Sequence, residues 1–215
     1  MRSVINGGRH YDIDGDKLPS VTTILSATQS DEKKASLAAW KAKMGDKAAD
    51  AVRDTAAERG TAMHTYLEHY LDGTGYKDLT PLGKQAEVMA NKIIESGLGD
   101  LEELWGLETT LYYPDLYAGA TDVVGVYGGQ PAIIDFKQSN KPKRREWIMD
   151  YFEQLGAYAM AHNQVYGTKI QSGIVLMCTK DFMFQKFEVS GREFVGHQHA
   201  FLRKVDQYYK NVSQA

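Results

Sequence analysis

Several features that identify other classes of protein are scarce in this chain of 215 residues. There is one cysteine, Cys178, which excludes an internal disulfide and cannot by itself hold zinc or an iron-sulfur cluster. The longest apolar runs, such as 155–161, fall far short of the roughly 18 residues that cross a bilayer. Basic residues are not in excess, because 25 stand against 28 acidic ones. A disulfide scaffold, a membrane partner and a protein that coats DNA by bulk charge are therefore excluded.

The remaining composition is that of a globular protein with a substantial core. Hydrophobic residues make up 43% of the chain and charged residues 25%. The first residues show neither the apolar segment of a secretory signal nor the Arg- and Ser-rich pattern of a transit segment. We therefore expect a cytoplasmic protein in a reducing compartment, of a size that suits a bacterial or phage-encoded enzyme. The sequence leaves the oligomeric state open, and a monomer is the expectation.

Hydrophobic spacing predicts one domain over 1–215, with a mainly helical part at 1–100 and a sheet with flanking helices at 101–215. Gly60 is a candidate for a break or kink in the longest helix. The expected helices are 21–27, 31 to beyond 40, 46–71, 81–95, 150–166 and 190–209. The expected strands are 108–113, 117–126, 131–137, 170–178 and 182–189, and residues 4–13 are expected to form a hairpin. This pattern predicts an α/β (α+β) fold with a central mixed sheet flanked by helices.

A carboxylate and an amine share one face of the predicted strand 131–137. The two-residue period of a strand places Asp135 and Lys137 on the same side. Asp122 lies thirteen residues before Asp135 and is expected on the neighbouring strand. Paired carboxylates can hold a hard divalent cation for phosphodiester hydrolysis, and a lysine can orient the nucleophile. An ordinary cross-strand salt bridge remains the simpler explanation of a bare Asp-x-Lys triplet.

Six short motifs strengthen the nuclease interpretation through their order and spacing. They are Leu18–Thr22, Leu37–Lys41, Arg59–His64, Tyr117–Asp122, Ile134–Lys143 and Gln154–Tyr158. Together they resemble the RecB-like branch of the PD-(D/E)xK nucleases and, within it, the mitochondrial genome maintenance exonucleases. The resemblance spans most of the chain. It implies a restriction-endonuclease-like core with a helical N-terminal layer that arches over the active site.

The resemblance also implies a metal centre on the two predicted strands. Asp122 and Asp135 would bind Mg²⁺ or Mn²⁺, with the backbone carbonyl of Phe136 as a further ligand, and Lys137 would be the catalytic lysine. Phe136 stands where tryptophan is common in this branch, which changes little because its backbone is the ligand. Gln138 stands where threonine is usual and points to the opposite face, which affects substrate contacts rather than catalysis. The iron-sulfur relatives use four cysteines, so that cluster is excluded here.

Three further residues, His64, Gln154 and Tyr158, are assigned to the active site on the same basis. His64 matches a histidine that approaches the metal, although a histidine at the edge of an apolar helix stripe can also be purely structural. Gln154 and Tyr158 match a Gln-x-x-x-Tyr motif that supports the site, and they lie one helical turn apart. Glu108 is a further candidate ligand, with a solvated or strand-edge role equally open.

Basic and aromatic residues near these motifs are candidate DNA contacts. The segment after the catalytic strand carries four basic residues and a tryptophan, and the N-terminal helices carry a second mixed cluster. Such runs are often only solvated surface. Beside a metal site they would instead follow a phosphate backbone and stack bases. The candidates are Lys141, Lys143, Arg144, Arg145, Trp147, Trp40, Lys41, Ser20 and Thr22.

The sequence thus predicts a divalent-metal-dependent DNA exonuclease that prefers single-stranded ends or flaps. A duplex about 20 Å across would not enter a passage lined closely by helices. One alternative is a duplex-dependent exonuclease or flap endonuclease of phage replication or recombination. Another is a catalytically silent member of the fold that binds DNA or protein.

Overall fold

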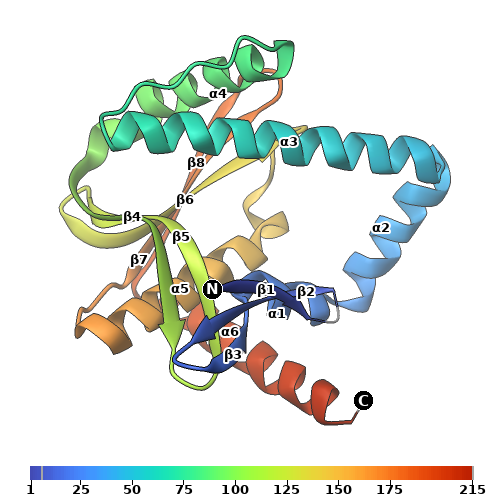
Figure 1. Cartoon of the computed structure of the whole chain (residues 1–215), viewed down its shortest axis with the longest axis vertical. Helices are drawn as coiled ribbons and strands as arrows, with labels where there is room; N and C mark the ends of the chain where they lie inside the picture. Colours follow the sequence, from blue (N-terminus) through green and yellow to red (C-terminus); the bar gives the residue numbers. More distant parts are fainter. Residues whose placement is uncertain (6, 215) are drawn as a thin grey trace.

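A five-stranded mixed sheet lies at the centre of the computed structural model, which describes residues 1–5 and 7–214 (Figure 1). Its strands follow the order β4-β5-β6-β7-β8. The first three form an antiparallel meander, β6 and β7 are parallel, and β8 is antiparallel to β7. The bounds are β4 Leu101–Tyr113, β5 Tyr117–Tyr127, β6 Gln130–Ser139, β7 Ser172–Thr179 and β8 Phe184–Ser190. The predicted mixed sheet flanked by helices is confirmed.

Helices cover both faces of this sheet because alternate strand residues are apolar on both sides. Ile133 packs in the core beneath α5 (Met149–Tyr166) and α6 (Gly191–Ser213), whereas Ile134 packs beneath α3 (Asp46–Leu71) and α4 (Pro81–Gly97). Helix α5 connects the parallel strands β6 and β7, as such a pair requires. Short 3₁₀ turns, η1 (Leu98–Asp100) and η2 (Arg145–Trp147), precede β4 and α5. No helix among the described residues is long and apolar enough to cross a bilayer.

The chain begins with a small antiparallel sheet that precedes the helices. Its strands are β1 (Arg2–Ile5), β2 (Gly8–Ile13) and β3 (Asp16–Pro19). Ser20 then caps α1 (Val21–Ala27) by accepting a 3.0 Å hydrogen bond from the Thr23 amide, and it forms a β-bridge with Ala118 of β5. This bridge fixes the start of α1 against the central sheet.

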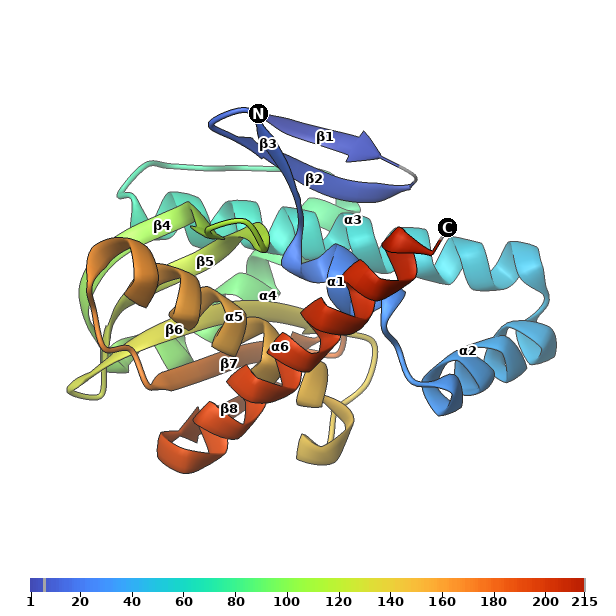
Figure 2. The same ribbon diagram turned by 90° about the horizontal axis from the view of Figure 1, so that it is seen from below.

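Helix α2 (Asp31–Met44) stands away from the body of the molecule (Figures 1 and 2). It contains no buried residue, and it ends at Gly45, whose φ of 82° suits glycine. The following helix α3 is continuous through Gly60, so the proposed break is absent. A Cβ at Gly60 would lie 3.2 Å from Cγ of Gln138, which shows that this glycine allows close approach to β6.

Both ends of α2 are tied to the body. Helix α1 packs on α5 and α6, and α3 packs on α4 and β6. Lys33 Nζ of α2 lies 2.6 Å from Asp150 Oδ2 at the start of α5. The segment 28–45 is therefore a continuous stretch of chain whose two ends are both anchored on the body of the molecule. We call this segment the covalent bridge.

Candidate metal centre and nucleic-acid cavity

Strands β5 and β6 separate at the position of the two predicted acids. Their ladder ends at the pair Val123 and Ile134, so Asp122 and Asp135 would form the next pair. Beyond this point β5 remains paired with β4, and β6 remains paired with β7. The two carboxylates therefore lie where neighbouring strands diverge and are no longer joined by backbone hydrogen bonds.

The side chain of Asp122 spans this divergence. Its Oδ2 accepts a 2.6 Å hydrogen bond from the Phe136 amide, and its Oδ1 lies 3.3 Å from His64 Nδ1. Burial raises the pKa of Asp122, but His64, Lys137 and the Phe136 amide together outweigh burial, so the pKa is lowered. Asp122 is therefore an anion attached to both β6 and α3.

Asp135 and Lys137 form an ion pair on the predicted shared face. Lys137 Nζ also lies 5.1 Å from the centre of the Tyr151 ring, within the range of a cation–π contact. Burial raises the pKa of Asp135, with Lys137 opposing and Asp122 adding to the rise. Burial lowers the pKa of Lys137, but Asp135 and Asp122 outweigh it, so its pKa is raised. Lys137 is therefore held as an ammonium group.

His64 reaches the same point from the opposite face of the sheet. Its Nε2 lies 2.9 Å from the Phe136 carbonyl oxygen, and both ring nitrogens face acceptors when the ring is protonated. Burial lowers the pKa of His64, but Asp122 outweighs it and raises the pKa to about 9. A positive ring thus lies between two of the oxygens that the sequence assigns to a cation.

Glu108 is the third member of a group of three possible metal-ligand residues. One donor atom each from His64, Glu108 and Asp122 lie within 4.8 Å of one another. Glu108 lies opposite Asp122 in β4 and has a φ of 47°, a conformation that costs a non-glycine residue about 1–3 kcal/mol. Burial and the charge of Asp122 raise its pKa. These carboxylates, with the Phe136 carbonyl, are the hard oxygen donors that suit Mg²⁺ or Mn²⁺.

Gln154 and Tyr158 lie one turn apart on α5. Gln154 Nε2 donates a 3.1 Å hydrogen bond to the Tyr158 hydroxyl, and both residues are buried. A Cβ at Gly119 would lie only 2.7 Å from Tyr158 Cε1. The glycine in the Tyr117–Asp122 motif therefore allows the tyrosine ring to pack against β5.

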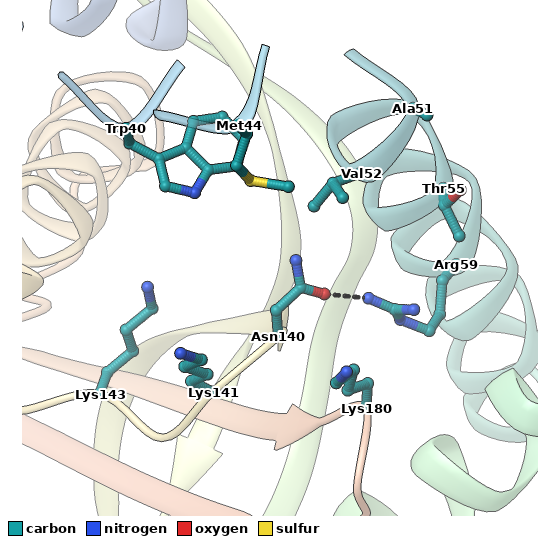
Figure 3. A pocket seen from close by; sticks show the side chains of 10 residues that line it. All are labelled: Trp40, Met44, Ala51, Val52, Thr55, Arg59, Asn140, Lys141, Lys143 and Lys180. Carbon is teal, nitrogen blue, oxygen red and sulfur yellow. Dashed lines mark hydrogen bonds between the residues drawn. The ribbon is translucent and has the colours of Figure 1, made fainter. Parts of the chain in front are cut away.

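Two cavities adjoin the site. One of about 480 Å³ is lined by residues that include His64, Glu108 and Lys137. A larger cavity of about 780 Å³ lies between α2, α3 and the segment that follows β6 (Figure 3). Its lining residues are Trp40, Met44, Ala51, Val52, Thr55, Arg59, Asn140, Lys141, Lys143 and Lys180.

The larger cavity brings together three of the predicted DNA contacts. Trp40 lies on the α2 side, opposite Lys141 and Lys143 (Figure 3). Lys41 lies 3.6 Å from both Asp46 and Asp50, so acidic neighbours already balance its charge.

The other predicted contacts lie outside the lining of this cavity. Arg144 stacks over the exposed ring of Trp147, with 5.3 Å between guanidinium carbon and ring centre. Arg145 donates 2.8 Å hydrogen bonds to Glu193 and to the Glu188 carbonyl, so its guanidinium is engaged within the fold.

Ser20 and Thr22 lie at the start of α1. Ser20 is buried, and its hydroxyl serves the helix cap. Thr22 is exposed, and its hydroxyl lies 3.0 Å from that of Ser20. A DNA contact by either residue stays a prediction.

Two residues at the site had no role in the sequence analysis. Tyr151 contacts Lys137, and Arg59 donates hydrogen bonds to Gln138 and Asn140. Arg59 belongs to the motif that contains His64, which is the sequence feature that marks it. For Tyr151 the sequence gives a weaker indication of a role at the site, namely its position three residues before Gln154 on α5.

Comparisons with known proteins give relatives of one kind. The chain is 29% identical over 175 residues to mitochondrial genome maintenance exonuclease 1 of Xenopus tropicalis, covering 76% of this chain and 49% of the relative. It is 29% identical over 177 residues to the human protein of that name, covering 76% and 50%. The chain thus spans about half the length of these curated relatives. No protein-family model matches.

A solved structure shares the fold. A putative exonuclease from Eubacterium rectale superposes with a TM-score of 0.52 at 16% identity, covering 73% of this chain and 66% of that one. At this identity the likeness shows the fold alone. The curated relatives confirm the resemblance that the motifs predicted: this chain is similar to mitochondrial genome maintenance exonuclease 1 over 76% of its length.

Proposed function

We propose that the chain is a divalent-metal-dependent deoxyribonuclease, an exonuclease that hydrolyses phosphodiester bonds at single-stranded ends or flaps. The observation that carries this proposal is the convergence of Asp122, Asp135 and Lys137 where β5 and β6 diverge. The exonuclease names of the homologues support the same class of reaction. As in the sequence analysis, a single domain acting as a monomer in a bacterial or phage-infected cytoplasm is our expectation.

The oxygen donors near β5 and β6 support a choice of metal ligands. Asp122, Asp135 and the Phe136 carbonyl would hold Mg²⁺ or Mn²⁺, with His64 and Glu108 beside them. Such an ion, when bound, polarises the phosphoryl oxygen and stabilises the charge on the leaving oxygen.

Lys137 acts on the nucleophile. Its raised pKa keeps it an ammonium, which orients a water molecule towards phosphorus and stabilises negative charge rather than accepting a proton. Water adds to phosphorus and releases a proton to the solvent, the bond to the leaving oxygen breaks, and that oxygen takes up a proton from the solvent. The reaction needs no covalent intermediate on the protein.

The covalent bridge over 28–45 supports the preference for ends. Its anchors on α5 and on the sheet mean that a strand can pass beneath α2 only by entering with a free end. The cavity beneath it, of about 780 Å³, suits a few nucleotides of single strand rather than a duplex. Trp40 and the lysines opposite it supply the stacking and phosphate contacts that single-strand binding uses.

A time course on 5′-labelled DNA tests the proposal and its alternatives. We expect magnesium-dependent shortening of a linear single strand and of a flap, and no cleavage in EDTA or of a circular single strand. Faster cleavage of a blunt duplex would favour the duplex-dependent alternative. Binding without cleavage in Mn²⁺ would favour the catalytically silent alternative, against which the intact set of Asp122, Asp135 and Lys137 argues, because a silent site is free to lose them.

A further inference from the structure

Arg59 is a buried cation whose hydrogen-bond partners are neutral. The residue is 5% exposed on α3. Its Nε donates a 3.1 Å hydrogen bond to Gln138 Oε1, and its Nη2 donates to Asn140 Oδ1. Within residues 1–5 and 7–214, no carboxylate oxygen lies within 4.0 Å of this guanidinium. The exposed Arg53, in contrast, pairs with Asp50 and Asp54.

A buried charge without a counter-ion is unfavourable unless something compensates it. Neutral amide acceptors satisfy the hydrogen bonds of the guanidinium but do not balance its charge. Burial lowers the pKa of Arg59, with Asp181 opposing, but a guanidinium remains charged at any physiological pH. The fold thus maintains a positive charge that no carboxylate of the described residues contacts directly, and Asp181 acts on it only at a distance.

The surroundings of Arg59 identify the class of partner. Arg59 and Asn140 line the larger cavity together with Lys141, Lys143 and Lys180, and none of the residues that line it is acidic (Figure 3). Because Asn140 Oδ1 accepts from Arg59, its Nδ2 donor is directed elsewhere and in Figure 3 points into the cavity. Every polar side chain that lines the cavity carries a hydrogen-bond donor, and the planar donors of a guanidinium match phosphate oxygens.

The position of Arg59 shows how far an anion bound there would lie from the metal centre. Gln138 directly follows Lys137, and Arg59 precedes His64 by five residues on the same helix, about 7 Å along its axis. An anion at Arg59 therefore lies next to the metal centre but not on it.

We propose that Arg59, with Asn140, binds one phosphodiester group of the DNA strand that enters the cavity, adjacent to the phosphate that is cleaved. This inference rests on the proposed function, because it assumes a nucleic-acid substrate. Arg59 also links α3 to the segment that carries Lys141 and Lys143. A purely structural link is the outcome that the experiment must distinguish.

The test measures binding without cleavage. A fluorescent single-stranded oligonucleotide is titrated in EDTA at several salt concentrations, with the wild type, Arg59→Gln, Gln138→Ala and Asn140→Ala. Loss of one phosphate contact on a single strand reduces the slope of log K against log salt by about 0.7. We expect this reduction in Arg59→Gln only, because the two controls keep the charge. Equal reductions in all three variants would indicate a structural link and overturn the proposal, as would an unchanged slope in Arg59→Gln.

A second measurement covers the case in which Arg59→Gln does not fold, as thermal melting would reveal. Arg59→Lys keeps the charge but loses the planar donors, so affinity should fall while the slope is retained; unchanged affinity would contradict a phosphate contact. Cleavage by the wild type in Mg²⁺ is measured in parallel. If the wild type cleaves DNA and the Arg59 variant binds DNA as tightly as the wild type does, this inference alone is overturned. If the wild type neither binds nor cleaves DNA, the proposed function is overturned as well.

Discussion

The pH dependence of folding in metal-free protein follows from the surroundings of His64. Burial lowers its pKa, but the charge and hydrogen bond of Asp122 outweigh this; Asp135 adds to the rise and Lys137 opposes it, so the pKa increases from 6.5 to about 9. A group whose pKa is raised by folding contributes fully to stability below its unfolded pKa and loses that contribution as the pH rises through the folded pKa. The free energy of unfolding should therefore fall between pH 6.5 and 9.

The size of the effect follows from the shift. Each pKa unit corresponds to about 1.4 kcal/mol, so the free energy of unfolding should fall by about 3 kcal/mol across this interval. With a urea dependence of about 2–3 kcal/mol/M for a chain of this size, the midpoint should fall by about 1 M. Burial lowers the pKa values of His162 and His197 below 6.5. Their titration therefore changes the free energy of unfolding mainly below pH 6.5 and not between pH 6.5 and 9.

Urea unfolding in EDTA, followed by tryptophan fluorescence at several pH values, measures this loss. His64→Gln keeps a hydrogen-bonding side chain but removes the titration, so its midpoint should be nearly constant between pH 6.5 and 9. His199→Gln, at an exposed position of α6, is the matched control and should follow the wild type. A wild-type midpoint that does not fall, or an equal fall in His64→Gln, would refute the reasoning.

Two further predictions concern the packing around the site. Gly119→Ala places a Cβ 2.7 Å from the buried Tyr158 ring and should destabilise the fold by about 1–3 kcal/mol, or lower Tm by about 3–10 °C in calorimetry; a wild-type Tm would show that the ring yields freely. Tyr151→Leu removes the ring face 5.1 Å from Lys137 Nζ and should lower kcat by roughly 5–30-fold with little change in KM. Tyr151→Phe keeps the face and should retain activity, so equal losses in the two variants would exclude the cation–π contact.

Local patterns in the sequence predict most of the fold. The β-branched runs mark β5 and β6, and helical spacing marks α3, whose buried residues Met63, Tyr66 and Leu67 recur at helical intervals. The first half of β4, from Leu101, was missed because it is largely exposed and lacks that alternation. The predicted hairpin over 4–13 corresponds to β1 and β2, apart from residue 6, which lies outside the described residues, whereas β3 is not predicted because its four residues are too few to show a period.

The site was predictable only where one element carries the information. The strand period places Asp135 and Lys137 together, and the helical turn joins Gln154 and Tyr158. The divergence of β5 and β6 follows from their different partners, which no local pattern contains. The contacts of Arg59 with Gln138 and of Tyr151 with Lys137 likewise join segments distant in the chain.

The most direct test of the account compares metal binding with cleavage in one set of variants. Mn²⁺ binding is measured by electron paramagnetic resonance, and magnesium-dependent cleavage on a labelled single strand, for the wild type, Asp122→Asn, Asp135→Asn and Lys137→Ala. We predict that both acid variants lose Mn²⁺ binding and cleavage, whereas Lys137→Ala still binds Mn²⁺ but does not cleave. Wild-type cleavage by either acid variant, or a wild type that binds no Mn²⁺, would contradict a metal centre at the divergence of β5 and β6.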